Sequence, residues 1–206
     1  MIMRTFLRLF PLAVAATVSL PAASAAQNGS LDPQRIFEAL ALRDGATVCE
    51  MGAGNGELTL AAAKIVGERG RVYSSELGDR QITVLEKAVA DRPQIRVVAA
   101  AAERTNFPDG ACDALFMRNV YHHFAAPEPI TRSMLASMRP GGRLAVVDFT
   151  PPGDEAPTPA DRDQDNMHGV KPETVSRELK AAGFEVVGSE SGSGRWFMVV
   201  AARPAS

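Results

Sequence analysis

The sequence has almost no excess of charge of either sign. Lys and Arg number 22 and Asp and Glu number 24, so the formal net charge is −2. Basic residues do not cluster within the body of the chain, so neither a nucleic acid nor an acidic membrane is indicated as a partner. With 206 residues, 46% hydrophobic and 22% charged, the chain is typical of one globular domain without internal repeats.

A continuous apolar run of about 20 residues, which a membrane-spanning helix needs, is also missing. The apolar stretch 11–21 is shorter and has proline at both ends. Two arginines precede it and the small residues 23–25 follow it, which is the three-part pattern of a secretory signal. We therefore expect a signal peptide over 1–25, a flexible N-terminus over 26–31 and the functional domain over 32–206.

A cleaved signal predicts an exported protein, in a bacterium one of the periplasm, without stable membrane insertion after cleavage. Two alternatives remain open for this segment. The uncleaved stretch would anchor the protein in the membrane, or it would form a buried N-terminal helix.

Cysteine is scarce, with only Cys49 and Cys112 in the chain. Export would permit a disulfide between them. Each, however, lies within or beside an apolar, strand-like run, and buried free cysteines commonly pack as small hydrophobic residues. We expect two buried free thiols.

The remaining pattern alternates between short apolar runs and helical spacing. Asp32 and Pro33 are typical of the first positions of a helix, and apolar spacing continues this helix to about Arg43. Further helices are expected at 57–66, 79–90, 128–138 and 171–182. Strands are expected at 47–51, 71–76, 95–99, 113–117, 142–149, 184–189 and 196–201.

Strands that are apolar throughout and separated by helices indicate a parallel sheet covered on both faces. The last two strands are separated only by Ser191-Gly192-Ser193-Gly194 and therefore predict an antiparallel hairpin. The expected fold class is α/β, with no second domain.

A glycine-rich loop, Gly52-Ala53-Gly54-Asn55-Gly56, follows the first strand. Such a loop allows the backbone to approach a ligand closely at the carboxyl edge of the sheet. A dinucleotide loop would place its last glycine at position 57, which is Glu57 here. Acids at Glu50 and Glu57 would repel a pyrophosphate but would accept a zwitterionic or cationic ligand.

The segment Glu50 to Gly56 resembles the E/D-x-G-x-G-x-G motif of class I S-adenosylmethionine-dependent methyltransferases. Other segments agree in order: Phe107 to Asp113 resembles F-P-D-x-x-F-D, Arg118 to Val120 resembles R-N-V, and Arg139 to Leu144 resembles K-P-G-G-R-L of the ubiquinone/menaquinone-biosynthesis type. The likeness spans about residues 32–202, and a signal-bearing bacterial subgroup of predicted methyltransferases is similar as well.

The resemblance implies a Rossmann-like, seven-stranded, mostly parallel sheet with a C-terminal antiparallel hairpin. It also implies S-adenosyl-L-methionine as cofactor and methyl transfer to a small-molecule acceptor. Glu50 would hold the cofactor's ammonium, Glu76 its ribose hydroxyls and Leu77 its adenine, while Asn119 would line the methyl-donor end. The full set of cofactor-binding residues implied by the resemblance is Glu50, Gly52, Ala53, Gly54, Gly56, Glu76, Leu77, Ala102, Glu103 and Asn119.

One position departs from that family's pattern. Where the family often has an aspartate facing the adenine amino group, this chain has Ala101. Either Glu103 replaces it, or backbone and packing contacts alone hold the adenine. Losing a charge-assisted hydrogen bond costs roughly 1.5 to 3 kcal/mol, so a modest cofactor affinity is expected.

The chain has only three histidines, His122, His123 and His168. They are candidate catalytic residues, because a general base or an acceptor-orienting group is needed if the acceptor begins protonated. We expect no metal site, because adjacent side chains such as His122 and His123 should diverge. An acidic segment that begins at Asp161 mimics a calcium loop, but it lacks the glycine and the final glutamate and should be a solvated loop.

Two other functions stay open. The chain is alternatively a catalytically degenerate exported domain that binds a cofactor or ligand, a reading that Ala101 and the export signal favour. A nicotinamide-dependent oxidoreductase is the third, less well supported by the loop. The acceptor itself is not readable, although the short polar segment 150–169 does not favour a bulky isoprenoid quinone.

Overall fold

The structure, a computed structural model, describes residues 31–192 and 194–205. The predicted signal peptide lies outside the described residues. Of the predicted flexible segment 26–31 only Leu31 is described, and the expectation is wrong for it, because its side chain is buried in the core. Among the described residues, no helix combines the length and the apolar character that a bilayer crossing requires.

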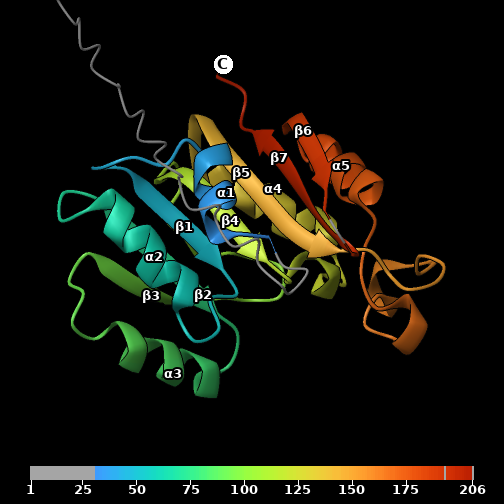
Figure 1. Cartoon of the computed structure of the whole chain (residues 1–206), viewed down its shortest axis with the longest axis horizontal. Coiled ribbons are helices and arrows are strands. Elements are labelled where there is room, and N and C mark those ends of the chain that lie inside the picture. Colours follow the sequence, from blue (N-terminus) through green and yellow to red (C-terminus); the bar gives the residue numbers. More distant parts are fainter. Residues whose placement is uncertain (1–30, 193, 206) are drawn as a thin grey trace, which may run out of the picture.

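The elements follow the predicted alternation of helices and strands (Figure 1). The strands are β1 Thr47–Met51, β2 Arg71–Glu76, β3 Ile95–Ala99, β4 Cys112–Arg118, β5 Met138–Phe149, β6 Glu185–Ser191 and β7 Trp196–Ala202. The α-helices are α1 Pro33–Ala39, α2 Glu57–Val66, α3 Asp79–Val89, α4 Pro127–Ser137 and α5 Pro172–Ala181. Three single 3₁₀ turns are η1 Tyr121–His123, η2 Pro159–Asp161 and η3 Asp165–Met167.

Two differences from the expected helix ends have a clear physical reason, and the remaining helix bounds agree within one residue. The Asp32 side chain accepts a hydrogen bond from the Gln34 amide at 3.0 Å and so caps α1 as predicted. α1 nevertheless stops at Ala39, because Ala41 has a φ of +51° that no α-helix accommodates. Met138, expected to end α4, begins β5 instead because it pairs with Cys112 of β4.

The seven strands form one sheet in the order β3-β2-β1-β4-β5-β7-β6. Pairing is parallel from β3 to β5, and β7 is antiparallel to both of its neighbours. The strand order reverses between β1 and β4, which is where ligands bind in open α/β sheets. The predicted α/β fold with a C-terminal antiparallel hairpin is confirmed.

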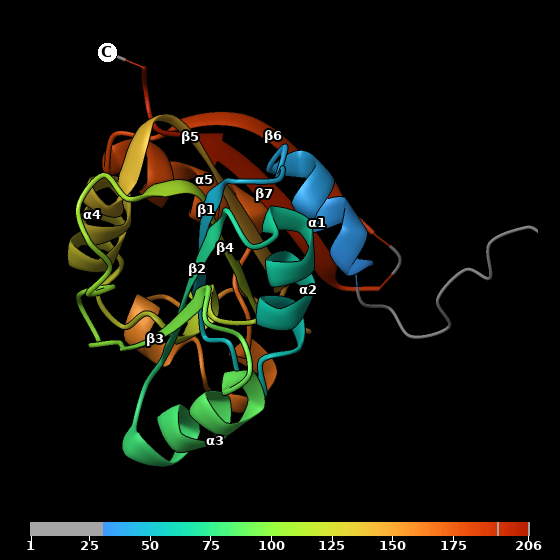
Figure 2. The ribbon, with the colours of Figure 1, turned by 90° about the vertical axis from the view of Figure 1, so that its left-hand side faces the viewer.

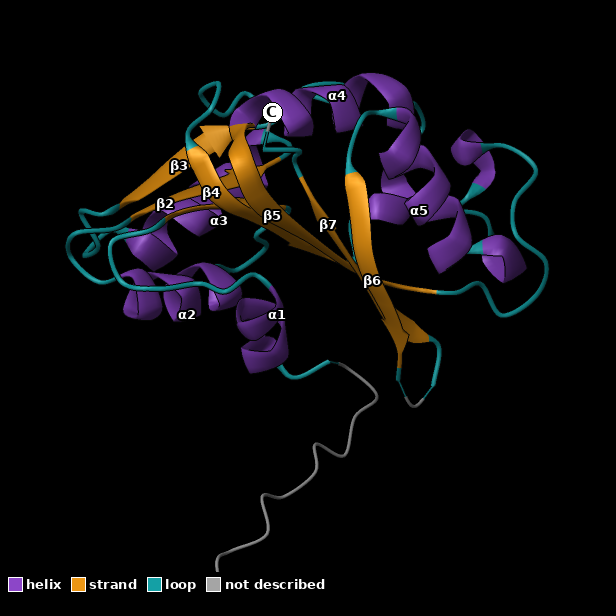
Figure 3. Ribbon diagram, turned by 90° about the horizontal axis from the view of Figure 1, so that it is seen from above, coloured by secondary structure: helices purple, strands orange, loops and turns teal. Residues whose placement is uncertain are grey.

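Helices cover both faces of the sheet. One core cluster joins α1, α2 and α3 to the sheet through side chains such as Phe37, Leu58 and Leu85. The other joins α4 and α5 through side chains such as Met134 and Leu179. Figure 3 shows these two helical layers on opposite sides of the strands. Figure 2 shows α1 and α2 on the side of the sheet opposite to α4.

The two cysteines are joined. Cys49 of β1 and Cys112 at the start of β4 form a disulfide with their Cα atoms 5.8 Å apart, so the expectation of free thiols is wrong. Both side chains are buried as expected. Local sequence shows that each lies in an apolar strand, but only the tertiary structure shows that the two strands are neighbours.

Candidate functional site

The glycine loop turns back over β2 directly after β1 ends. The amides of Gly52 and Ala53 both donate to the Ser75 carbonyl, at 3.0 and 3.1 Å. Gly52 and Gly54 have φ angles of +68° and +56°, a region that side chains disfavour. The turn therefore depends on glycine at these two positions.

Space around the loop differs between its glycines. A Cβ added to Gly52 would lie 2.3 Å from a methyl carbon of Val120, whereas one added to Gly54 would meet no atom within 4 Å. Gly56, before α2, would bring a Cβ within 3.2 Å of Leu85. Gly54 thus leaves its backbone open to a ligand, while Gly52 and Gly56 serve close packing.

Glu76, the last residue of β2, reaches back to this open backbone. Its carboxylate accepts hydrogen bonds from the amide of Gly54 and, at 3.0 Å, from the amide of Leu77. The Leu77 side chain is 59% exposed, which is unusual for a large apolar residue beside a sheet edge. The sheet edge here presents a carboxylate and an uncovered apolar surface side by side.

Glu50 lies inside the protein rather than on the open side of the loop. Its carboxylate accepts hydrogen bonds from the hydroxyls of Thr59 and, at 3.3 Å, Ser74. Burial raises the pKa of Glu50 to about 7, and these two hydrogen bonds oppose that rise. Glu50 ties β1, β2 and α2 together beneath the loop.

The predicted adenine side of the site is an exposed turn after β3. Ala101 and Arg104 exchange two backbone hydrogen bonds, of 3.0 and 3.3 Å. Ala102 and Glu103 lie within this turn and are exposed. The structure thus places both near the β2 and β3 ends but buries neither.

A pocket of about 250 Å³ lies beyond β4 and β5. Asn119 lines this pocket. Its backbone has a φ of +58°, and its amide donates to the Val147 carbonyl at 2.9 Å. Arg118 also pairs with Glu57 of α2 at 3.2 Å, which links the pocket to the end of the glycine loop. The residues lining the pocket are Leu31, Arg118, Asn119, Val147, Phe149, Arg195 and Trp196.

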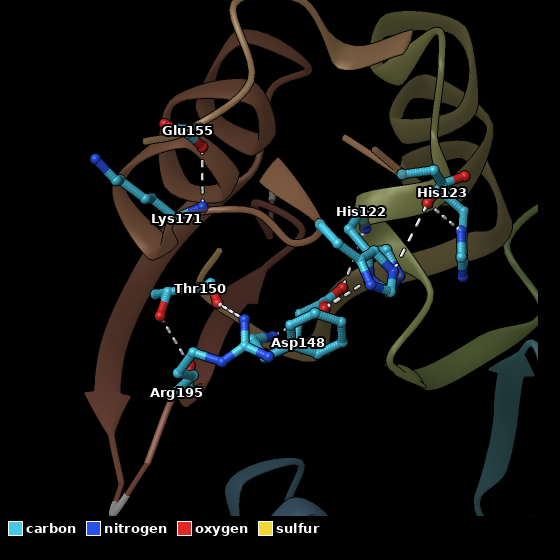
Figure 4. Close-up of polar contacts among 10 residues, drawn as sticks. His122, His123, Asp148, Thr150, Glu155, Lys171 and Arg195 are labelled. Carbon is cyan, nitrogen blue, oxygen red and sulfur yellow. Dashed lines mark hydrogen bonds and ion pairs between the residues drawn. The ribbon is translucent and has the colours of Figure 1, made fainter. Parts of the chain in front are cut away.

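Arg195 precedes β7 and is fixed to the end of β5. Its guanidinium donates to the Thr150 carbonyl at 2.6 Å and lies 5.2 Å from the Phe149 ring centroid (Figure 4). Because β7 runs antiparallel, its first residues lie at the same sheet edge as the carboxyl ends of the other strands. The C-terminal hairpin thereby completes the pocket.

His122 is held by a buried carboxylate. Its Nδ1 lies 2.8 Å from Asp148 Oδ1, and its amide donates to Asp148 Oδ2 at 3.1 Å (Figure 4). Asp148 is fully buried and His122 is 2% exposed. A carboxylate can only accept, so Nδ1 of His122 carries a proton, and in the neutral form of the ring Nε2 then has a free lone pair.

The other two histidines join this pair. His168 Nε2 lies 3.1 Å from His122 Nε2, and His123 Nδ1 lies 2.7 Å from Asp163 Oδ1. The ring centroids of His122 and His123 are 3.9 Å apart, so the expectation that their side chains diverge is wrong. The structure brings together all three histidines named from the sequence.

Sequence reasoning missed the two acids of this group. Asp148 carried a signal, because it is an acid near the end of an otherwise apolar strand, and buried carboxylates need partners. Asp163 carried none, because it resembles its neighbours in an acidic loop. A second cavity, of about 480 Å³ between α5 and β6, contains none of the residues predicted for the site.

Comparison with known proteins agrees with this geometry. Residues 49–146 match a family described as "Methyltransferase domain". The ubiquinone/menaquinone biosynthesis C-methyltransferase UbiE of Azotobacter vinelandii is 34% identical over 119 residues, which are 56% of this chain and 47% of that protein. The chain thus spans about half the length of the curated relatives it matches.

Solved structures share the fold. A SAM-dependent methyltransferase from Aquifex aeolicus is 24% identical with a TM-score of 0.71, over 84% of this chain and 89% of that one. The [4+2]-cyclase SpnF is 18% identical with a TM-score of 0.73, over 84% and 81%. The fold is therefore that of these proteins, and the second of them is named for a reaction other than methyl transfer.

Proposed function

We propose that this chain, which matches a methyltransferase domain over residues 49–146, is a class I S-adenosylmethionine-dependent methyltransferase and transfers a methyl group from S-adenosyl-L-methionine to a small-molecule acceptor. The observation that carries the proposal is the open backbone at Gly54 beside the Glu76 carboxylate. Gly54 follows β1, one of the two strands between which the sheet order reverses, and Glu76 ends the neighbouring strand β2, so both lie beside the usual ligand position of such sheets.

The cofactor would bind along the ends of β1 and β2. Glu76 has lone pairs for both ribose hydroxyls in addition to the two amides it already binds, since a carboxylate accepts about four hydrogen bonds. The exposed Leu77 would pack against the adenine, which would remove its apolar surface from water. Glu50 would contribute to cofactor binding indirectly, because its hydrogen bonds to Thr59 and Ser74 hold together the elements beneath the loop.

The acceptor would occupy the pocket beyond β4 and β5, with Asn119 toward the methyl group. At about 250 Å³ the pocket is slightly below the range of about 300 to 1,000 Å³ typical of drug-sized ligands. A compact acceptor fits this volume, and a quinone with an isoprenoid tail does not. Alignment of the acceptor with the methyl group would be the main contribution to catalysis, and His122, His123 or His168 would act as a base or orienting group for an acceptor that begins protonated.

We also propose that the protein acts outside the cytoplasm, in the periplasm or attached to the membrane by its N-terminal segment. The disulfide between Cys49 and Cys112 supports this location, because disulfides persist in oxidising compartments and are rare in the cytosol. Separating the periplasmic, membrane and cytoplasmic fractions of cells that express the full chain tests it. Recovery in the cytoplasmic fraction alone would refute it.

A catalytically degenerate ligand-binding domain is the second candidate. Ala101, at the position where the resemblance would place an aspartate facing the adenine, favours it. The fold is compatible with either function, since folds host unrelated reactions. Methyl transfer to an acceptor separates the two candidates.

Calorimetric titration of the purified protein with S-adenosylmethionine and S-adenosylhomocysteine, with NAD as control, tests the cofactor. Saturable binding of the first two and none of NAD is expected. Release of S-adenosylhomocysteine across a panel of small phenols, amines and thiols then tests catalysis. Cofactor binding without turnover on any acceptor would favour the degenerate domain, and no cofactor binding would overturn the proposal.

A further inference from the structure

His122 has the orientation of a metal-binding histidine. Its Nδ1–H donates to Asp148, which also accepts the amides of His122 and Phe149 at 3.1 and 2.8 Å. Asp148 thereby accepts three hydrogen bonds and fixes the imidazole ring. Metal-ligating histidines commonly donate their second nitrogen to a carboxylate in this way, because it sets the tautomer and the ring angle.

The distance between His122 Nε2 and His168 Nε2 fits two ligands of one ion. They are 3.1 Å apart. Two nitrogens at about 2.0 to 2.1 Å from a tetrahedral zinc ion are about 3.3 Å apart along the edge of the tetrahedron. A hydrogen bond between the two rings would fit the same distance, with one of the two Nε2 atoms protonated. A measurement of metal binding therefore distinguishes the two arrangements.

Asp163 supplies a third ligand atom. Its Oδ1 lies 3.9 Å from His168 Nε2, and the ligand atoms of His122, His168 and Asp163 all lie within 4.8 Å of one another. Asp163 is 56% exposed and His168 is 44% exposed, so both side chains have room for the shift of up to about 1.5 Å that brings separations of up to 4.8 Å to the tetrahedral edge. His123 Nδ1, 2.7 Å from the same carboxylate oxygen, holds Asp163 in place.

We propose that His122, His168 and Asp163 bind one divalent transition-metal ion, with Zn²⁺ as the best-fitting example, through the two Nε2 atoms and one carboxylate oxygen. Imidazole nitrogen suits zinc and its neighbours, whereas calcium and magnesium prefer oxygen ligands alone. Three protein ligands leave a fourth position for water or another small ligand. The proposal rests on these residues and holds whether or not the protein transfers methyl groups.

The ion would lie beside the acceptor pocket and behind one of its walls. Phe149 lines the pocket, and its ring centroid lies 4.7 Å from that of His122 and 5.1 Å from that of His168. The ion would also fasten the segment after β5 to η1, because His168 and Asp163 come from the former and His122 from the latter. Figure 4 shows His122 and His123 together above Asp148, at the end of the sheet where β5 finishes.

The test is calorimetric titration of the full chain, freed of any affinity tag and of metal, with Zn²⁺. We expect one site per chain. His168→Ala and Asp163→Asn each change an exposed side chain, so folding should be preserved, and circular dichroism checks this. Each variant should weaken zinc binding by about tenfold or more.

Asp165→Asn is the matched control, because Asp165 is an exposed acid two positions from Asp163 and is not part of the cluster. Its zinc affinity should equal that of the unchanged protein. Co²⁺ in place of Zn²⁺ should add a tetrahedral absorption spectrum that His168→Ala abolishes. No saturable zinc binding, or equal binding by His168→Ala, would overturn the proposal in favour of a simple hydrogen bond between the two histidines.

Discussion

Glu76 is the residue whose side chain would meet the cofactor most directly. Glu76→Ala removes the carboxylate that accepts from Gly54 and Leu77 and that would accept from the ribose. Hydrogen bonds to a charged group contribute about 1.5 to 3 kcal/mol, so S-adenosylmethionine affinity should fall by more than tenfold. Titration calorimetry measures the change.

The matched control is Glu86→Ala, which removes an exposed acid from α3 away from the strand ends. Its affinity for the cofactor should match that of the unchanged protein. Equal affinity for Glu76→Ala and Glu86→Ala would show that Glu76 does not hold the ribose.

Alanine at Gly52 should mainly reduce stability, whereas alanine at Gly54 should mainly reduce affinity for the cofactor. Gly54→Ala meets open space and bears only the left-handed backbone penalty of about 1 to 2 kcal/mol, yet its methyl group would intrude on the cofactor. Gly52→Ala adds a contact of 2.3 Å with Val120, and overpacking costs about 1 to 3 kcal/mol more. Urea unfolding should show the larger loss for Gly52→Ala.

Cofactor titration completes this comparison. Gly54→Ala should lose affinity out of proportion to its small loss of stability. Wild-type affinity in a folded Gly54→Ala protein would mean that no ligand approaches the loop at this position.

Among the elements, β1 and β4 are joined covalently at the point where the sheet order reverses. Cys49 and Cys112 are separated by 63 positions in the sequence, and closing a loop of that length stabilises the folded state by about 4 kcal/mol in the chain-entropy description. Reduction of the native protein should therefore lower its free energy of unfolding by several kcal/mol. Urea unfolding with and without dithiothreitol measures this on one and the same sequence.

The double variant Cys49→Ala with Cys112→Ala provides the control, because its unfolding should be insensitive to dithiothreitol. On a non-reducing gel the unchanged protein should migrate faster than this variant, since the closed loop makes the denatured chain more compact. Equal migration would show that the disulfide does not form.

Most elements could be predicted because their signals are local. Asp32 and Pro33 mark the start of α1, and apolar runs mark every strand except β5 within two residues of its observed bounds. Local signals failed at Met138, where pairing with Cys112 overrode helical spacing. They failed for the disulfide for a related reason, because strand order is a property of the whole sheet.

At the scale of the molecule, stability should depend on pH through Glu50. Burial raises its pKa from 4.5 to about 7, so between these values the folded protein binds more protons than the unfolded chain. The free energy of unfolding should then fall as pH rises from about 4.5 to about 7 and level off above, a loss of about 3 kcal/mol. Urea unfolding at several pH values checks this.

Glu50→Gln isolates that contribution, because glutamine keeps an acceptor for Thr59 and Ser74 but does not titrate. The free energy of unfolding of the unchanged protein, measured relative to that of Glu50→Gln, should fall as pH rises from 4.5 to about 7. A difference that does not vary with pH would show that Glu50 is not the titrating group.

The candidate site was only partly predictable. The glycine loop, Glu76 and Asn119 follow strands whose carboxyl ends share an edge, so their order in the sequence places them together. The cluster of His122, Asp148 and His168 joins residues 26 and 46 positions apart. Only the packing of the segment after β5 brings them into contact, and no spacing rule for local sequence describes that packing.

The pocket wall is completed only when β7, the last strand of the chain, joins the sheet. The loop that would hold the cofactor rests on the Ser75 carbonyl of β2 and packs against Val120 after β4, whereas Arg195 and Trp196, much later in the sequence, form part of the pocket wall. A ribosome or a translocation channel releases residues in order, so a chain that is still emerging has the first of these and lacks the second. Cleavage before Arg195 would remove this part of the pocket wall together with the buried side chains of Phe197 and Val199, so one strand completes both the pocket and the core.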